Sequence, residues 1–273
     1  MKENIVVRDL KVTSRSMLTG KWKQGAIINL LLAVIFIGTG ILKGLLGLGS
    51  MAIDDSGHVV LSIVVDIVTG FVALGIYNGA ILGWTASFYR FVNGESELNI
   101  KSYSEFLVDR FKKSFCYGFA YSFFIGIWTL GFYIVGIMAM ALITKTDSTI
   151  LTLLLLIIGS IAIIGGIVIG IVKVVEYSMA RYIIIDRPDI RAREALKESK
   201  RLIYGYKVNY IILGLHFIGW IILTVVTCGI AGLWVGSYFG TTEAQFYKKL
   251  KELKKTSDSS SDMDAFTQGV EIE

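Results

Sequence analysis

The sequence predicts an all-α, polytopic membrane protein with six transmembrane helices, arranged as three helical hairpins with amphipathic helices on the cytoplasmic side. Of its 273 residues, 54% are hydrophobic and 18% are charged, whereas charged residues make up about a quarter of an ordinary soluble domain. The apolar residues form runs of about 20, the length that a helix needs to cross a bilayer core about 30 Å thick. The runs lack the alternation of strands, and open sheet edges cannot face lipid.

The six runs are each about 20 residues long or longer, and they are predicted to span the membrane at residues 26–48, 59–89, 114–143, 150–175, 208–226 and 230–247. Short polar turns separate the two members of each pair, which predicts three hairpins. Residues 1–25 are expected to form a cytoplasmic amphipathic segment and residues 26–250 a single transmembrane domain. Residues 251–273 are polar and are expected to be a disordered cytoplasmic tail.

The basic residues set the orientation, because short cytoplasmic loops of membrane proteins retain Lys and Arg. Of the 27 such residues, 25 lie before the first span, between spans two and three, between spans four and five, or after span six. The exceptions are Lys43 and Lys145. Both termini are therefore predicted to be cytoplasmic, in a protein of the cell membrane.

Small residues recur at intervals of four in the returning helix of each hairpin. Residues four apart share a helix face, and in lipid such faces let two helices approach closely. The residues predicted to pack helices together are Gly75, Gly79, Gly83, Gly166, Gly170, Gly232, Gly236 and Gly240. The shared layout leaves open whether the three hairpins are internal repeats.

The segment before span five, residues 192–203, has the apolar spacing of one helix face and basic residues elsewhere. Such a helix is expected in the cytoplasmic interface, with its apolar face toward lipid and its basic residues near anionic headgroups. Loop helices that serve only topology are the alternative, and docking of a membrane-protein partner or a second copy is another. Orientation accounts for the basic character of the chain, so nucleic acid is not expected as a partner.

Ionisable residues inside spans are costly and suggest function. Lys43 is late in span one and Asp66 is early in span two, so an ion pair that closes the first hairpin is the favoured interpretation, with a proton or ion site as the alternative. A second group lies near the cytoplasmic ends of spans four and six and predicts either interfacial ion pairs or the lining of a cytoplasmic vestibule. Its members are Lys173, Glu176, Tyr177, Arg181 and Glu243.

Motifs for catalysis are scarce. The two histidines and two cysteines do not have the spacing of a zinc site, and the sequence contains neither a Gly-x-Ser-x-Gly elbow nor a phosphate-binding loop. No catalytic, cofactor or metal site is predicted, and the chain is not expected to be an enzyme. An enzyme that acts on lipid would need polar groups converging around Glu176, Arg181 and Glu243.

The sequence therefore supports two hypotheses for the function. The first is a non-catalytic membrane scaffold or accessory factor, including one that protects the envelope or confers immunity to a membrane-active peptide. The second is a small transporter or channel for a solute or a lipid. The single proline weakens the second hypothesis, because broken helices usually frame transport sites.

Residues 176–189, EYSMARYIIIDRPD, and residues 194–200, EALKESK, resemble the domain of unknown function 975 family of bacterial integral membrane proteins. The segments that extend the resemblance are residues 18–22, 217–220, 227–234 and 242–247. It is strongest over residues 173–250. It implies a multi-pass protein of a kind common in Gram-positive bacteria, similar in layout to the membrane domains attached to some glycerophosphodiester phosphodiesterases, and no established reaction. A proline expected near Gly170 is absent, which argues against a kink there.

Overall fold

The computed structural model describes residues 5–55, 59–143, 145–146 and 148–270, and within these residues the chain folds into helices without strands. The helices are α1 (Val7–Leu18), α2 (Trp22–Asp55), α3 (Val59–Val92), α4 (Lys101–Ser104), the π-helical turn η1 (Glu105–Asp109), α5 (Phe111–Ile143), α6 (Thr149–Tyr177), α7 (Ala180–Asp186), α8 (Ala192–Leu202), α9 (Lys207–Val226) and α10 (Gly232–Val270). The predicted all-α class is therefore confirmed.

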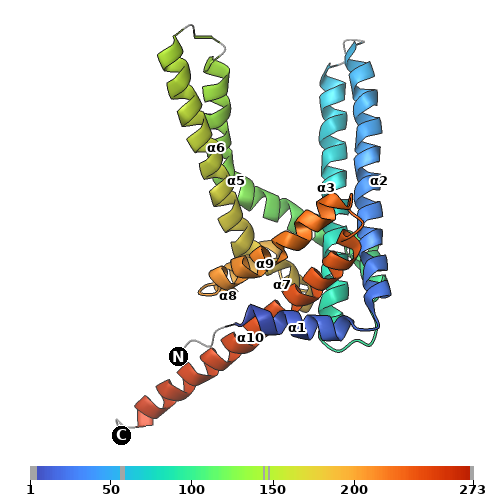
Figure 1. Ribbon diagram of the computed structural model, residues 1–273, viewed down its shortest axis with the longest axis vertical. Coiled ribbons are helices and arrows are strands. Elements are labelled where there is room, and N and C mark those ends of the chain that lie inside the picture. The colour runs from blue at the N-terminus through green and yellow to red at the C-terminus, as the bar shows by residue number, and fades with distance from the viewer. Residues whose placement is uncertain (1–4, 56–58, 144, 147, 271–273) are drawn as a thin grey trace.

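Two tall hairpins dominate the molecule, one formed by α2 and α3 and the other by α5 and α6 (Figure 1). They stand on a common base and diverge away from it. Five helices of the described chain are long and apolar enough to cross a membrane, and their apolar parts are Trp22–Leu45, Ile63–Val92, Phe111–Ile143, Thr149–Asp186 and Lys207–Val226. Five of the six predicted spans lie in these helices.

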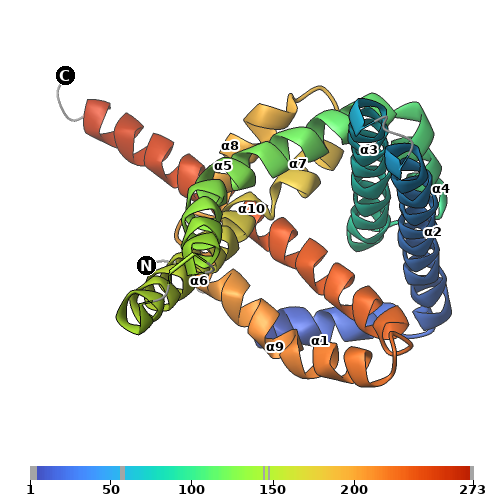
Figure 2. The same ribbon diagram turned by 90° about the horizontal axis from the view of Figure 1, so that it is seen from above.

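The third hairpin, α9 and α10, lies across the base rather than alongside the other two. Seen from above, α2 and α3 are foreshortened, whereas α1, α9 and α10 are viewed along their length (Figure 2). The turn between α9 and α10 needs Gly229, whose φ is +91°, a conformation that glycine adopts without steric cost. The sixth predicted span, residues 230–247, lies in α10, which is not among the five apolar helices because polar side chains such as Thr241, Thr242 and Glu243 interrupt its apolar run.

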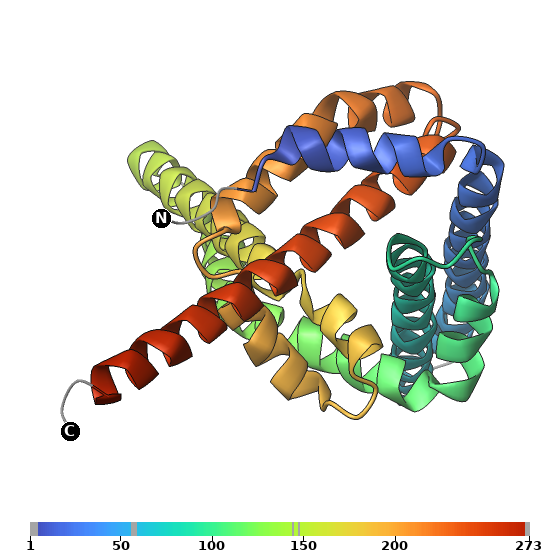
Figure 3. The same ribbon diagram turned by 90° about the horizontal axis from the view of Figure 1, so that it is seen from below.

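The base is a layer of short and crossing helices. Figure 3 shows α10 running diagonally below the hairpins, with α1 on one side and α7 and α8 on the other. Its interior holds fully buried aromatic side chains, among them Phe88, Phe106, Tyr182 and Phe246. The Tyr103 hydroxyl donates to the carbonyl oxygen of Ile28 at 2.9 Å; burial raises the pKa of this tyrosine, which keeps the hydroxyl protonated as a donor.

The structure differs at the base from two of the expectations drawn from the sequence. The apolar face of α8 packs against the protein itself, since Ala195, Leu196 and Ser199 are buried, so lipid does not cover that face. The helix α10 continues to Val270, where the sequence argument expected disorder beyond residue 250. Leu250 is buried and Leu253 packs on the core, so the apolar stripe of α10 runs past the expected boundary and supports further helix.

Candidate functional site

The most buried charge of the base belongs to Glu243 of α10, whose side chain is 0% exposed. Its carboxylate forms an ion pair with the guanidinium of Arg181, from α7. It also accepts a hydrogen bond from the Tyr210 hydroxyl at 2.5 Å and one from the Tyr182 hydroxyl at 3.2 Å. A charge removed from water is tolerated only when partners satisfy it in this way. The carboxylate thus joins α7, α9 and α10.

A second carboxylate, Glu176 at the end of α6, is held between two lysines. Lys173, one turn earlier, lies 2.9 Å from one carboxylate oxygen, and Lys207 of α9 lies 2.6 Å from the other. The carbonyl oxygen of Glu176 accepts a hydrogen bond from the Ser199 hydroxyl of α8 at 2.8 Å. Lys173 also lies 4.5 Å from the ring centre of Trp128. Through these contacts α5, α6, α8 and α9 meet at one point.

A third carboxylate, Asp186 at the end of α7, was not among the site residues predicted from the sequence. It accepts a hydrogen bond from the Tyr89 hydroxyl at 2.8 Å and pairs with Lys251 of α10 at 2.5 Å. Tyr89, Tyr182 and Tyr247 pack against one another, with ring centres 5.1 to 5.9 Å apart. Asp186 lies inside the segment that carries the family resemblance, and that position is the signal that could have identified it.

Four of the five residues of the predicted vestibule therefore fall into two networks. Lys173 and Glu176 belong to one, and Arg181 and Glu243 belong to the other. The fifth residue, Tyr177, lines a cavity with Arg181. A vestibule continuous across all five residues stays a prediction.

That cavity has a volume of about 260 Å³ and lies where α3, α5, α6 and α7 meet. Its wall carries several tyrosines, together with Asn78, Ser122, Ser178 and Arg181. The Nε atom of Arg181 is buried and has no hydrogen-bond acceptor in the structure. A buried guanidinium N–H without a partner costs free energy and calls for an explanation.

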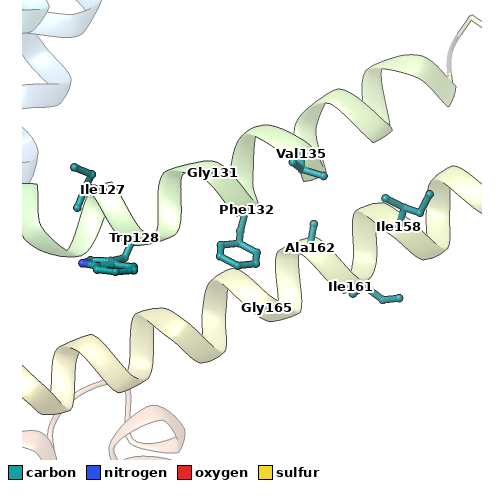
Figure 4. Close-up of a pocket in the computed structure, with 9 residues that line it drawn as sticks. All are labelled: Ile127, Trp128, Gly131, Phe132, Val135, Ile158, Ile161, Ala162 and Gly165. Carbon is teal, nitrogen blue, oxygen red and sulfur yellow. The ribbon is translucent and has the colours of Figure 1, made fainter.

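A larger hollow of about 610 Å³ lies between α5 and α6 and differs in chemistry (Figure 4). Its side chains are apolar apart from the indole of Trp128, and Phe132 and Ala162 lie close to its centre. A surface of this kind suits hydrocarbon.

Lys43 and Asp66 lie on the first hairpin, away from the base. Lys43 lines a small pocket between α2 and α3 together with Val68 and Thr69, so it stands within one helical turn of Asp66 along α3. Both side chains lie on exposed parts of the helix surface. The ion pair between them stays a prediction.

Each of the predicted packing glycines lies close to another helix, which in some cases is the partner helix of the same hairpin. A methyl group on Gly83 would lie 2.8 Å from the Cα atom of Tyr103, and one on Gly240 would lie 2.8 Å from the ring of Phe88. The equivalent distance is longest at Gly170, where Thr129 lies 3.5 Å away. The same close approach occurs for the other members, Gly75, Gly79, Gly166, Gly232 and Gly236.

Asn29 ties the first hairpin to α10. Its amide nitrogen donates to the Leu233 carbonyl at 2.9 Å and to the Ser237 hydroxyl at 2.8 Å. Its amide oxygen accepts from the indole N–H of Trp84 at 2.8 Å. The amide therefore links α2, α3 and α10, as expected for a polar side chain that stabilises helix packing in lipid.

The charged side chains of the base described above are therefore held in ion pairs with one another. In the part of the chain that the structure describes, no group of three or more His, Cys, Asp or Glu side chains could hold a metal ion. The long apolar helices above it are compatible with a multi-pass membrane protein.

Comparison with known families agrees with this class. The family model described as "Protein of unknown function (DUF975)" matches residues 1–254, and the chain belongs to this family. No curated protein and no solved structure matches the chain.

Proposed function

We propose that this chain is a non-catalytic, six-span protein of the cell membrane that serves as a scaffold or accessory factor, with protection of the envelope or immunity to a membrane-active peptide as its specific role. One observation carries the proposal. The carboxylates Glu176, Asp186 and Glu243 are each paired with a cation from a different helix. Carboxylates held in this way stabilise the fold and are poorly placed to act as catalytic acids or bases.

The proposed topology has both termini in the cytoplasm. The contact between α1 and the part of α10 around Tyr238 and Gln245 supports it, because it places the first helix and the start of the last helix together at the base. The exposed sides of α1 and α8 carry basic residues such as Arg15, Lys197 and Arg201, which suits a surface of anionic headgroups.

Topology is tested by labelling single cysteines with a membrane-impermeant reagent in whole cells, after Cys116 and Cys228 have been replaced. We expect Asp55→Cys to be labelled from outside and Arg8→Cys not to be labelled. Labelling of Gly229→Cys from outside would support six complete crossings. If that residue is protected from both sides, α9 and α10 enter and leave through the same face, and the sixth span is wrong.

The protective role is tested by deleting the gene and challenging the cells with a broad panel of membrane-active peptides. We expect increased susceptibility to at least one peptide class, restored by the wild-type gene. Unchanged susceptibility across the panel would remove this role.

A small transporter is the second candidate, and the polar cavity beside Arg181 is the observation that favours it. Purified protein in liposomes would then carry a solute or ion flux that empty liposomes lack. Absence of flux for a panel of ions, sugars and amino acids would count against it.

A further inference from the structure

The cavity between α3, α5, α6 and α7 has a closed floor and an open rim. Tyr117, Asn78 and Ser178 at the floor are buried, with Tyr117 only 4% exposed. Tyr77 and Val174 at the rim are 46% and 44% exposed. The rim residues come from α3 and α6, which belong to different hairpins. The mouth therefore lies between α3 of the first hairpin and α6 of the second. These two hairpins diverge away from the base (Figure 1).

The wall offers unused hydrogen-bond donors. The Nε–H of Arg181 has no acceptor. The hydroxyl groups of Tyr117 and Tyr121 form no hydrogen bond with another residue of the described chain, although their rings pack 5.8 Å apart. Donors gathered in this way suit a ligand rich in acceptor oxygens, and a guanidinium matches a phosphate especially well.

The surrounding charge is positive by one unit. Three cations, Lys173, Arg181 and Lys207, face two carboxylates, Glu176 and Glu243. A ligand that carries a single negative charge would balance these groups. The phosphate of a phospholipid headgroup carries that charge and also supplies acceptor oxygens.

Beyond the mouth the helices become apolar. Ile67 lies on α3, nearly three turns outward from Tyr77 at the rim, and Ile171 and Ile167 continue outward along α6; all three side chains are about half exposed. The cavity itself, at about 260 Å³, is smaller than the roughly 300–1,000 Å³ of sites that enclose a whole drug-sized ligand. It has room for the polar end of an amphiphile, with hydrocarbon left outside along the hairpins.

From these observations we propose that the cavity binds the phosphate headgroup of a membrane phospholipid, whose acyl chains lie between the two diverging hairpins. Arg181 and the tyrosine hydroxyls would donate hydrogen bonds to the phosphate oxygens. The inference rests on the proposed place of the chain in a membrane, but it is tested in detergent. A failure of the binding experiment would therefore leave the topology experiment unaffected.

The test uses the purified full chain in a neutral detergent, titrated with dioctanoylphosphatidylglycerol and followed by native mass spectrometry. We expect one saturable molecule per chain. Ser122→Trp places a large ring at the exposed rim and should weaken binding at least tenfold. Ser160→Trp is the matched control on an exposed face of α6, outside the cavity, and should bind as the wild type does.

Two further probes separate the sources of affinity. Inorganic phosphate and dioctanoylglycerol, which lacks the phosphate, should each bind at least tenfold more weakly than the phospholipid. Equal binding of inorganic phosphate would mean a simple anion site, and equal binding of dioctanoylglycerol would mean an apolar one. Either result, or undiminished binding by Ser122→Trp, would overturn the proposal.

Discussion

The base of the molecule and the outer halves of the two hairpins are held together by different means. In the base, buried aromatic rings, three paired carboxylates and the Asn29 amide join helices that are far apart in sequence. In the outer halves, each helix packs mainly on its hairpin partner, and most large apolar side chains are exposed, as at Ile41 and Ile157. Polar contacts and the close approach of glycines such as Gly83 and Gly240 hold the first region together, whereas contacts between hairpin partners hold the second.

The difference fits the membrane location proposed above. In that location the hairpins are surrounded by lipid, which is as apolar as their side chains, so burying those side chains against protein gains little and association depends on close fit and hydrogen bonds. Where the helices offer no such contacts, the hairpins separate. Where Gly75 and Gly79 let α3 approach Phe111 and Leu107, they stay together.

The largest expected effect comes from the charge at the centre of the base. Replacing Glu243 by Gln leaves Arg181 without its buried counter-charge and should lower the free energy of unfolding in detergent by about 3 kcal/mol. Glu252→Gln, on an exposed turn of the same helix, is the control and should change it by less than about 0.5 kcal/mol. Chemical unfolding of both variants measures the difference. Equal stability of the two variants would show that the ion pair of Glu243 with Arg181 does not stabilise the base.

Two glycines of α3, Gly83 in the base and Gly70 in the outer half, allow the packing of the two regions to be compared within one helix. A methyl group at Gly83 would meet the backbone of Tyr103 at 2.8 Å, whereas none of the described atoms lies within 4 Å of one at Gly70. We expect Gly83→Ala to reduce stability by about 1–3 kcal/mol through overpacking. Gly70→Ala should be neutral or stabilising, because alanine favours helix more than glycine does. If the two variants unfold alike, the close approach in the base is not a source of stability.

The smallest effect is expected in the outer part of the second hairpin. A methyl group at Gly159 would lie 3.3 Å from the Cβ atom of Ala139, a contact that a small shift of one helix relieves. Gly159→Ala should therefore change the free energy of unfolding by less than about 1 kcal/mol. A loss as large as that of Gly83→Ala would show that the hairpins are as tightly packed as the base.

Hydropathy and charge were enough to predict the all-α class and the five helices that are long and apolar enough to cross a membrane. The length and apolar content of a helix depend only on the sequence of that segment. The spacing of Lys173 and Glu176 on one helix face likewise placed them within reach of one another. The slant of α9 and α10 was not predictable in this way, since it depends on contacts such as Asn29 with Ser237, residues 208 positions apart. Asp186 was not predicted as a site residue for the same reason, because its partners Tyr89 and Lys251 lie on other helices.

The continuity of α10 has a mechanical consequence. From Glu243 to Val270 the chain forms uninterrupted helix, a rod about 40 Å long at 1.5 Å per residue. Long helices curve only gently unless a proline or an inserted group kinks them, and this segment contains no proline. A small tilt imposed at the buried carboxylate is therefore magnified into a wide swing at the far tip.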